Sequence, residues 1–143
     1  MANPLLRLAV LAVVALIAAA IVLGGRFFVE RQRRLALAAA PLLEGSDQSP
    51  GKIRILAFSS ADCTQCHTLQ QPVLRRLQAL RGEEIDVVEV DAPSSPELTG
   101  RYHILTVPST VVLNALGEAQ AINYGFAHLG KLQEQIDAML VSA

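Results

Sequence analysis

The hydrophobic pattern divides the chain into an N-terminal apolar run and a C-terminal part that alternates between strand-like and helix-like segments. Residues 5–23 are apolar apart from Arg7, and Asn3 followed by Pro4 is a typical helix start. A helix over this run is about 28 Å long, close to the ~30 Å hydrocarbon thickness of a bilayer. We therefore predict a transmembrane anchor over residues 1–25.

A cleaved secretory signal is the main alternative to an anchor, because a short charged start and an Ala-rich core also suit that role. Its best cleavage candidate, residues 38–40, lies beyond a group of arginines and far from the apolar core. These are Arg26, Arg31, Arg33 and Arg34. Positive charge beside a span tends to stay in the cytoplasm, so we expect a single-pass protein of the cell membrane with its C-terminal part on the cytoplasmic side.

Residues 26–51 are predicted to form a helical stalk and a linker. The first part, residues 26–43, is rich in Ala, Leu and Arg. Its arginines lie either among lipid headgroups or on a merely solvated helix end. Residues 44–51 then collect Gly, Ser, Asp and Pro, which are typical of loops. This linker marks the start of a domain over residues 52–143.

Within that domain, β-branched runs alternate with helical spacing in the order β-α-β-α-β-β-α. The predicted strands are residues 52–59, 85–90, 110–113 and 119–124, and the predicted helices are residues 66–81, 95–102 and 129–140. Helical spacing places Leu69, Val73, Leu74, Leu77 and Leu80 on one face of the first helix, and Leu132, Ile136 and Leu140 on one face of the last. The pattern predicts one α/β domain.

The charge balance argues against a nucleic-acid partner. The chain has 12 Lys and Arg against 13 Asp and Glu, a formal net charge of −1 and no basic stripe in its second half. A zinc site needs about four ligands. Beyond the two cysteines only His67, His103 and His128 remain, and none has zinc-finger spacing. We expect no metal and no cofactor.

Both cysteines of the chain, Cys63 and Cys66, come directly after a predicted strand and at the start of a predicted helix. A thiolate at a helix N-terminus is stabilised by unpaired backbone N–H groups and the helix dipole, which can lower its pKa from about 8.5 to roughly 3.5–7.5. Such a sulfur attacks disulfides at neutral pH. Together with Val107-Pro108 further along the chain, the pair predicts a thiol-disulfide redox site.

The order of elements, the Cys-x-x-Cys motif after the first strand and Val107-Pro108 before the last hairpin resemble the thioredoxin-like superfamily. The likeness covers about residues 52–143 and includes Val88 to Asp91, Arg101-Tyr102 and the hairpin at Gly117. It implies a thioredoxin-like three-layer α/β/α sandwich, here preceded by one N-terminal transmembrane helix. It also implies a cis Val107–Pro108 bond, a cis-proline that presents the Val107 backbone to an extended substrate. A trans proline at a strand start is the alternative.

By the same resemblance, Cys63 is the exposed nucleophile and Cys66 the shielded resolving thiol of a redox-active disulfide. Cys63 attacks a client disulfide, and Cys66 then displaces the product as the ring closes. The spacing permits this because residues three apart share a helix face. We predict a membrane-anchored protein disulfide oxidoreductase, an enzyme whose partners are protein disulfides or dithiols and, through its anchor, membrane lipid.

The sequence departs from the thioredoxin pattern around the cysteines. Asp62 stands where the family usually has Trp, and its negative charge disfavours a neighbouring thiolate. The family's buried acidic residue is Ala57 here, so Cys66 must lose its proton to water or another group. Pro72 falls one position later after the second cysteine than in typical thioredoxins, which predicts a shifted kink. The dipeptide between the cysteines leaves open whether the site reduces or oxidises its clients.

Two other functions remain as alternatives. The missing acidic and aromatic support, together with small residues over 12–20, suits a non-catalytic accessory subunit packed against other membrane subunits. Residues 63–67 also form a Cys-x-x-Cys-His attachment sequence for c-type haem, with Met139 as a possible distal ligand. The bracketing strands and the expected cytoplasmic side disfavour haem. His67 either supports the Cys63 thiolate when protonated or is a solvated surface residue.

Overall fold

The computed structural model describes residues 3–38 and 51–142, which divide into two compact units, Met1–Arg34 and Leu35–Ala143. Helix α1 (Pro4–Leu37) is continuous and about 51 Å long. Its most apolar window of 18 residues has a mean hydropathy of 2.8 and no buried residue, so α1 is long and apolar enough to cross a membrane. Residues 39–50 lie outside the described residues. They include most of the predicted linker and the end of the candidate cleavage site.

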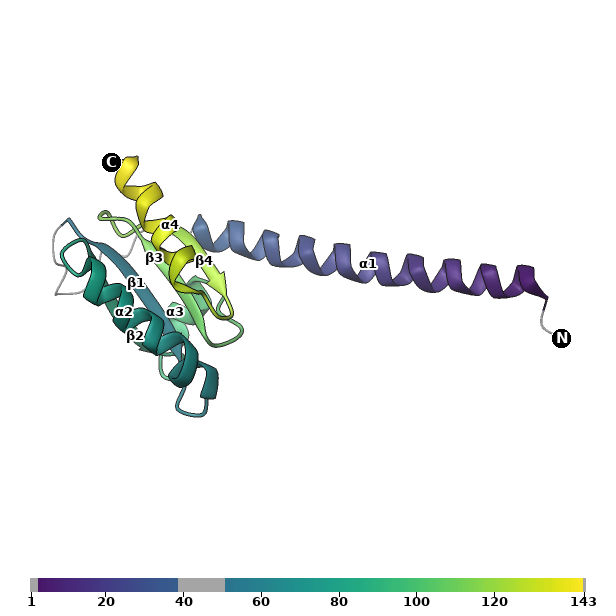
Figure 1. The fold of residues 1–143 in the computed structure, drawn as a ribbon, viewed down its shortest axis with the longest axis horizontal. Helices are drawn as coiled ribbons and strands as arrows, with labels where there is room; N and C mark the ends of the chain where they lie inside the picture. Colours follow the sequence, from purple (N-terminus) through teal and green to yellow (C-terminus); the bar gives the residue numbers. More distant parts are fainter. Residues whose placement is uncertain (1–2, 39–50, 143) are drawn as a thin grey trace. The chain divides into compact units, whose positions relative to one another are not determined.

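The C-terminal unit is built on a four-stranded sheet with the order β2-β1-β3-β4. Strand β1 (Ile53–Ser59) runs parallel to β2 (Ile85–Asp91) and antiparallel to β3 (Ser109–Leu113), and β3 pairs antiparallel with β4 (Ala119–Tyr124). Helices α2 (Gln71–Arg81) and α4 (Leu129–Val141) lie on one face of the sheet, and the short α3 (Pro96–Arg101) lies on the other (Figure 1). The predicted order of strands and helices and the three-layer α/β/α architecture are confirmed.

Alternate side chains of β1 enter two separate cores, because successive residues of a strand point to opposite faces. Ile53, Ile55 and Ala57 join the core beneath α2 and α4. Leu56 and Phe58 join the core on the opposite face, which also takes in Ala36 from the last turn of α1. Strand β1 is therefore buried on both faces and paired on both edges, so its end is a fixed point of the domain.

The helix that carries Cys66 contains a π turn near its start. Residues Cys66–Gln70 are π-helical, and the chain continues as the α-helix α2 with Pro72 in its first turn. A π turn holds one residue more than an α turn. The extra residue of the π turn accounts for the position of Pro72, one residue later than in typical thioredoxins. The helix is thus irregular before Pro72.

The π turn also corrects the predicted apolar face of this helix. Leu74 and Leu77 are buried as predicted, but Leu69 is 47% exposed and Gln70, at 3%, is buried in its place. The extra residue rotates the turn relative to a regular helix, which moves Gln70 inward. Leu80 and Leu140, in the last turns of α2 and α4, are also exposed. The apolar faces of both helices thus end one turn earlier than predicted.

A matched pair of leucine truncations tests this register. Leu74→Ala should lower the free energy of unfolding by about 2–5 kcal/mol, because it opens a cavity in a closed core. Leu69→Ala should change it by no more than about 0.5 kcal/mol, because this side chain already contacts water. Denaturant unfolding of the full chain in detergent measures both. Equal losses would show that the helix is α-helical from Cys66 and that Leu69 belongs to the core.

Candidate functional site

Cys63 and Cys66 are joined by a disulfide, with 5.3 Å between their Cα atoms. Strand β1 ends at Ser59, and a short turn brings Cys63 to the position just before the first helical residue. There the backbone N–H of Cys66 donates to Sγ of Cys63 over 3.2 Å. The sulfur of Cys63 thus occupies the place of a helix-capping acceptor, where free N–H groups and the helix dipole favour negative charge.

The two cysteines differ in their access to solvent. Cys66 is 4% exposed and packs under the first helical turn, whereas Cys63 is half-buried. Of the two sulfur-bearing residues, Cys63 is therefore the one that another protein can reach more easily. A thiolate formed there would also face the positive end of the helix.

Strand register brings the Val107-Pro108 peptide to the same end of the sheet as the cysteines. Phe58, near the end of β1, pairs with Ser109, the first residue of β3. The Val107–Pro108 bond directly before Ser109 is cis, as expected from the resemblance. Pro108 is buried and Val107 is half-buried. The sheet therefore places this cis peptide and the cysteine-bearing turn at the same end of its two central strands.

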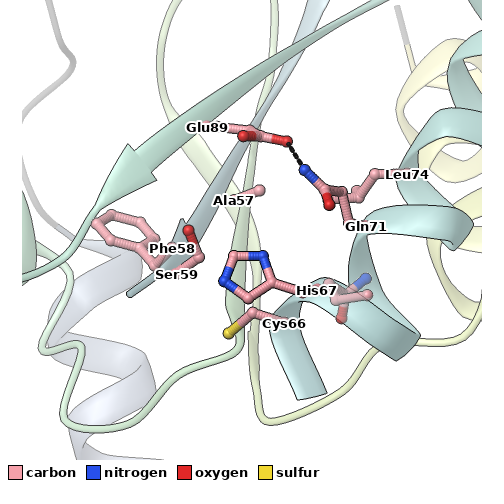
Figure 2. Close-up of a pocket in the computed structure, with 9 residues that line it drawn as sticks. Ala57, Phe58, Ser59, Cys66, His67, Gln71, Leu74 and Glu89 are labelled. Carbon is pink, nitrogen blue, oxygen red and sulfur yellow. Dashed lines mark hydrogen bonds between the residues drawn. The ribbon is translucent and has the colours of Figure 1, made fainter. Parts of the chain in front are cut away.

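A small pocket with a cavity volume of about 30 Å³, partly open to solvent, lies between β1, β2 and the first turns of the helix (Figure 2). Ala57, Cys66, His67 and Glu89 are among its lining residues. Ala57 pairs in register with Glu89 of the neighbouring parallel strand, so both side chains point to the same face of the sheet. Glu89 accepts a hydrogen bond of 3.1 Å from Nε2 of Gln71. The pocket thus contains a carboxylate beside the position where the family's buried acid is missing.

The ionisable groups next to the cysteines are exposed. Asp62 and His67 both lie at the surface, where solvent weakens charge interactions. His67 nevertheless has a fixed neighbour, because its Nε2 lies 3.3 Å from the carbonyl oxygen of Ala61. Its ring also lines the pocket beside Cys66.

Gln70 forms a contact that the sequence analysis did not predict. Its amide Nε2 donates to the carbonyl oxygen of Ala127 over 3.1 Å, and its Oε1 accepts from the Ala127 N–H over 2.8 Å. This buried pair of hydrogen bonds ties the helical turn after Cys66 to the loop between β4 and α4. The only sequence signal for it was the late position of Pro72, which marks the extra residue of the π turn.

The haem hypothesis requires His67 and Met139 to approach the same ligand. His67 lines the pocket at the end of β1, whereas Met139 lines a separate hollow with Ile53, at the beginning of β1. The two side chains therefore lie at opposite ends of this strand. Among residues 3–38 and 51–142, no group of three His, Cys, Asp or Glu side chains is arranged to hold a metal ion.

Comparison with known proteins points to one family. No family model matches the chain. The thioredoxin of Bacillus subtilis is 30% identical over 78 residues, which cover 54% of this chain and 73% of that protein. The thioredoxin of Listeria monocytogenes is 29% identical over 80 residues, or 56% of this chain and 76% of its own length.

Solved structures share the fold. Thioredoxin-2, a component of the protein secretion machinery of the malaria parasite, has a TM-score of 0.59 at 21% identity and covers 67% of this chain and 90% of its own. The germline-specific thioredoxin Deadhead of Drosophila melanogaster has a TM-score of 0.55 at 24% identity over 62% of this chain and 82% of its own.

Replacing Gln70 tests its role at the site. Gln70→Leu should destabilise the protein by about 2–4 kcal/mol, because the Ala127 N–H and C=O would stay buried without partners. The Ala127 amide should also exchange its hydrogen faster with solvent. Gln78→Leu, at an exposed position of α2, is the matched control and should leave both quantities unchanged. Unchanged protection of the Ala127 amide in Gln70→Leu would refute this role.

Proposed function

Since the chain belongs to the thioredoxin family of thiol-disulfide oxidoreductases, we propose that it is a membrane-anchored member that exchanges disulfides with client proteins. The observation that carries this proposal is the Cys63–Cys66 disulfide at the start of a helix, with Sγ of Cys63 accepting the Cys66 N–H. This arrangement can stabilise a thiolate on Cys63 after reduction.

The exchange uses the two cysteines in different roles. In the reduced protein, the Cys63 thiolate attacks one sulfur of a client disulfide, forming a mixed disulfide and releasing a client thiolate. Cys66 then loses its proton and attacks Sγ of Cys63. The Cys63–Cys66 bond forms, the bond to the client breaks, and two electrons have passed to the client. The burial of Cys66 supports its role as the resolving thiol, because external disulfides cannot reach it easily.

Val107 and Pro108 bind the client backbone in this proposal. The register of β1 and β3 supports this role, because the pairing brings the cis peptide to the end of the sheet where the cysteines lie. An extended client segment can add to the Val107 backbone as a short strand, which orients its sulfur toward Cys63. Main-chain pairing of this kind accepts many client sequences.

Helix α1 anchors the protein in the cell membrane. Its apolar length supports a single span, and the cluster of arginines after residue 25 supports a cytoplasmic redox domain. Tethering raises the effective concentration of membrane-proximal clients. Clients of this protein are therefore expected to be membrane proteins or their close neighbours.

Single cysteine variants test the two roles. Cys66→Ser should accumulate mixed disulfides with client proteins, because the attack on the client still occurs and its resolution does not. Cys63→Ser should trap none. Non-reducing electrophoresis of full-chain protein from intact membranes, followed by reduction and identification of the released proteins, measures the difference.

An insulin-reduction assay of the full chain with dithiothreitol separates the oxidoreductase from the accessory-subunit alternative. The loss of the buried acid at Ala57 motivates that alternative. Wild type should accelerate insulin reduction, and Cys63→Ser should not. Equal trapping by both cysteine variants, together with no insulin reduction, would favour a non-catalytic subunit.

Alkaline carbonate extraction of membranes tests the anchor. The wild-type chain should stay in the membrane pellet. Replacing both Leu11 and Leu16 by Lys should shift it to the soluble fraction, because each charge at the centre of a span costs about 2.5–3.5 kcal/mol. Replacing the same residues by Val should leave it in the pellet. Extraction of the wild-type chain by carbonate would contradict a membrane span.

A further inference from the structure

We propose that His67 is the base that accepts the proton of Cys66 when the mixed disulfide is resolved. This inference rests on the proposed function and supplies a step that the function leaves open. The pocket below Cys66 is lined by Ala57, whose methyl group cannot accept a proton. Another group must therefore deprotonate the buried resolving thiol.

The pocket offers two side chains that can accept a proton. Strand β1 contributes Ala57 and Ser59, which carry no basic group; β2 contributes Glu89; and the helix contributes His67. Asp62, in the turn before Cys63, is exposed and is not among the pocket residues. The choice is thus between the carboxylate of Glu89 and the imidazole of His67.

His67 is favoured by its position. It follows Cys66 in the chain, and its ring lies in the pocket with the Nδ1 edge facing Ala57 and Glu89 and the opposite edge nearer the sulfur of Cys66 (Figure 2). The carbonyl oxygen of Ala61 can only accept a hydrogen bond, so the neutral ring carries its proton on Nε2, which lies 3.3 Å away. Nδ1 is then the unprotonated nitrogen and can accept a proton.

The chemistry of the two groups also favours imidazole. Glu89 is exposed and already accepts the hydrogen bond from Gln71. As a type of group, imidazole is a stronger base than a carboxylate. A base matched to the working pH transfers protons most effectively. The pocket also has room for a water molecule that can carry the proton between Cys66 and the ring.

The step balances without any further reactant. The Cys66 thiol gives its proton through one water in the pocket to Nδ1 of His67, and its thiolate attacks Sγ of Cys63. The Cys63–Cys66 bond forms as the bond from Cys63 to the client sulfur breaks. The client sulfur leaves with the bonding electron pair and takes the proton from the imidazolium, which restores neutral His67.

Stopped-flow reaction of the reduced full chain, in detergent, with a chromogenic aromatic disulfide tests this role. The first release of aromatic thiolate reports the attack by Cys63, and the second reports the attack by Cys66. At pH 7, His67→Gln should slow the second phase about tenfold or more and leave the first unchanged. The second phase should recover as the pH rises toward 9, where the thiol ionises without help. Added imidazole should restore the second phase of His67→Ala.

Glu89→Gln, which changes the other pocket base, is the matched comparison and should keep the second phase within about twofold of wild type. An unchanged second phase in His67→Gln, or a slow one in Glu89→Gln alone, would overturn the assignment to His67. Slowing of the first phase alone would also overturn it and would make His67 a stabiliser of the Cys63 thiolate. If the wild-type protein showed neither release phase, the proposed function itself would be refuted.

Discussion

The site depends on the way in which β1 is held between β2 and β3. Because β1 is paired on both edges and buried on both faces, its C-terminal end is fixed in space. Parallel pairing with β2 places Glu89 beside Ala57, and antiparallel pairing with β3 places Pro108 next to the end of β1. The turn that carries Cys63 starts from the same point. One strand therefore assembles the disulfide, the cis peptide and the pocket.

The π turn after this strand determines which side chain of the helix turns toward the core. A regular helix would turn Leu69 toward the core, and the extra residue brings in the polar Gln70 instead. Its two hydrogen bonds to Ala127 compensate for burying an amide and fix the loop between β4 and α4 against the helix of the cysteines. The site is thus tied to the sheet on one side and to this loop on the other.

In the C-terminal domain, the sequence predicted the order of the strands and helices and their bounds to within one residue, because β-branched runs and leucine spacing report burial directly. It also predicted the cysteine motif at a helix start and, through the family resemblance, the cis bond at Pro108. It could not show that Gln70 is buried, since one inserted residue changes the phase of a helix without changing its composition. Nor could it pair Glu89 with Ala57, because strand register depends on contacts between distant segments. Spacing alone therefore identified the cysteines and missed the pocket beneath them.

The most direct test of the account is a redox titration of the full chain in its membrane. The membranes are equilibrated with thiol-disulfide buffers of graded potential, quenched with acid and alkylated, and the number of alkylated cysteines is counted by mass spectrometry. We expect a reversible two-electron transition in which Cys63 and Cys66 become alkylated together, so that each molecule carries either no alkylated cysteine or two. Cysteines that stay unreactive at every potential, or that change one at a time, would contradict a redox-active pair.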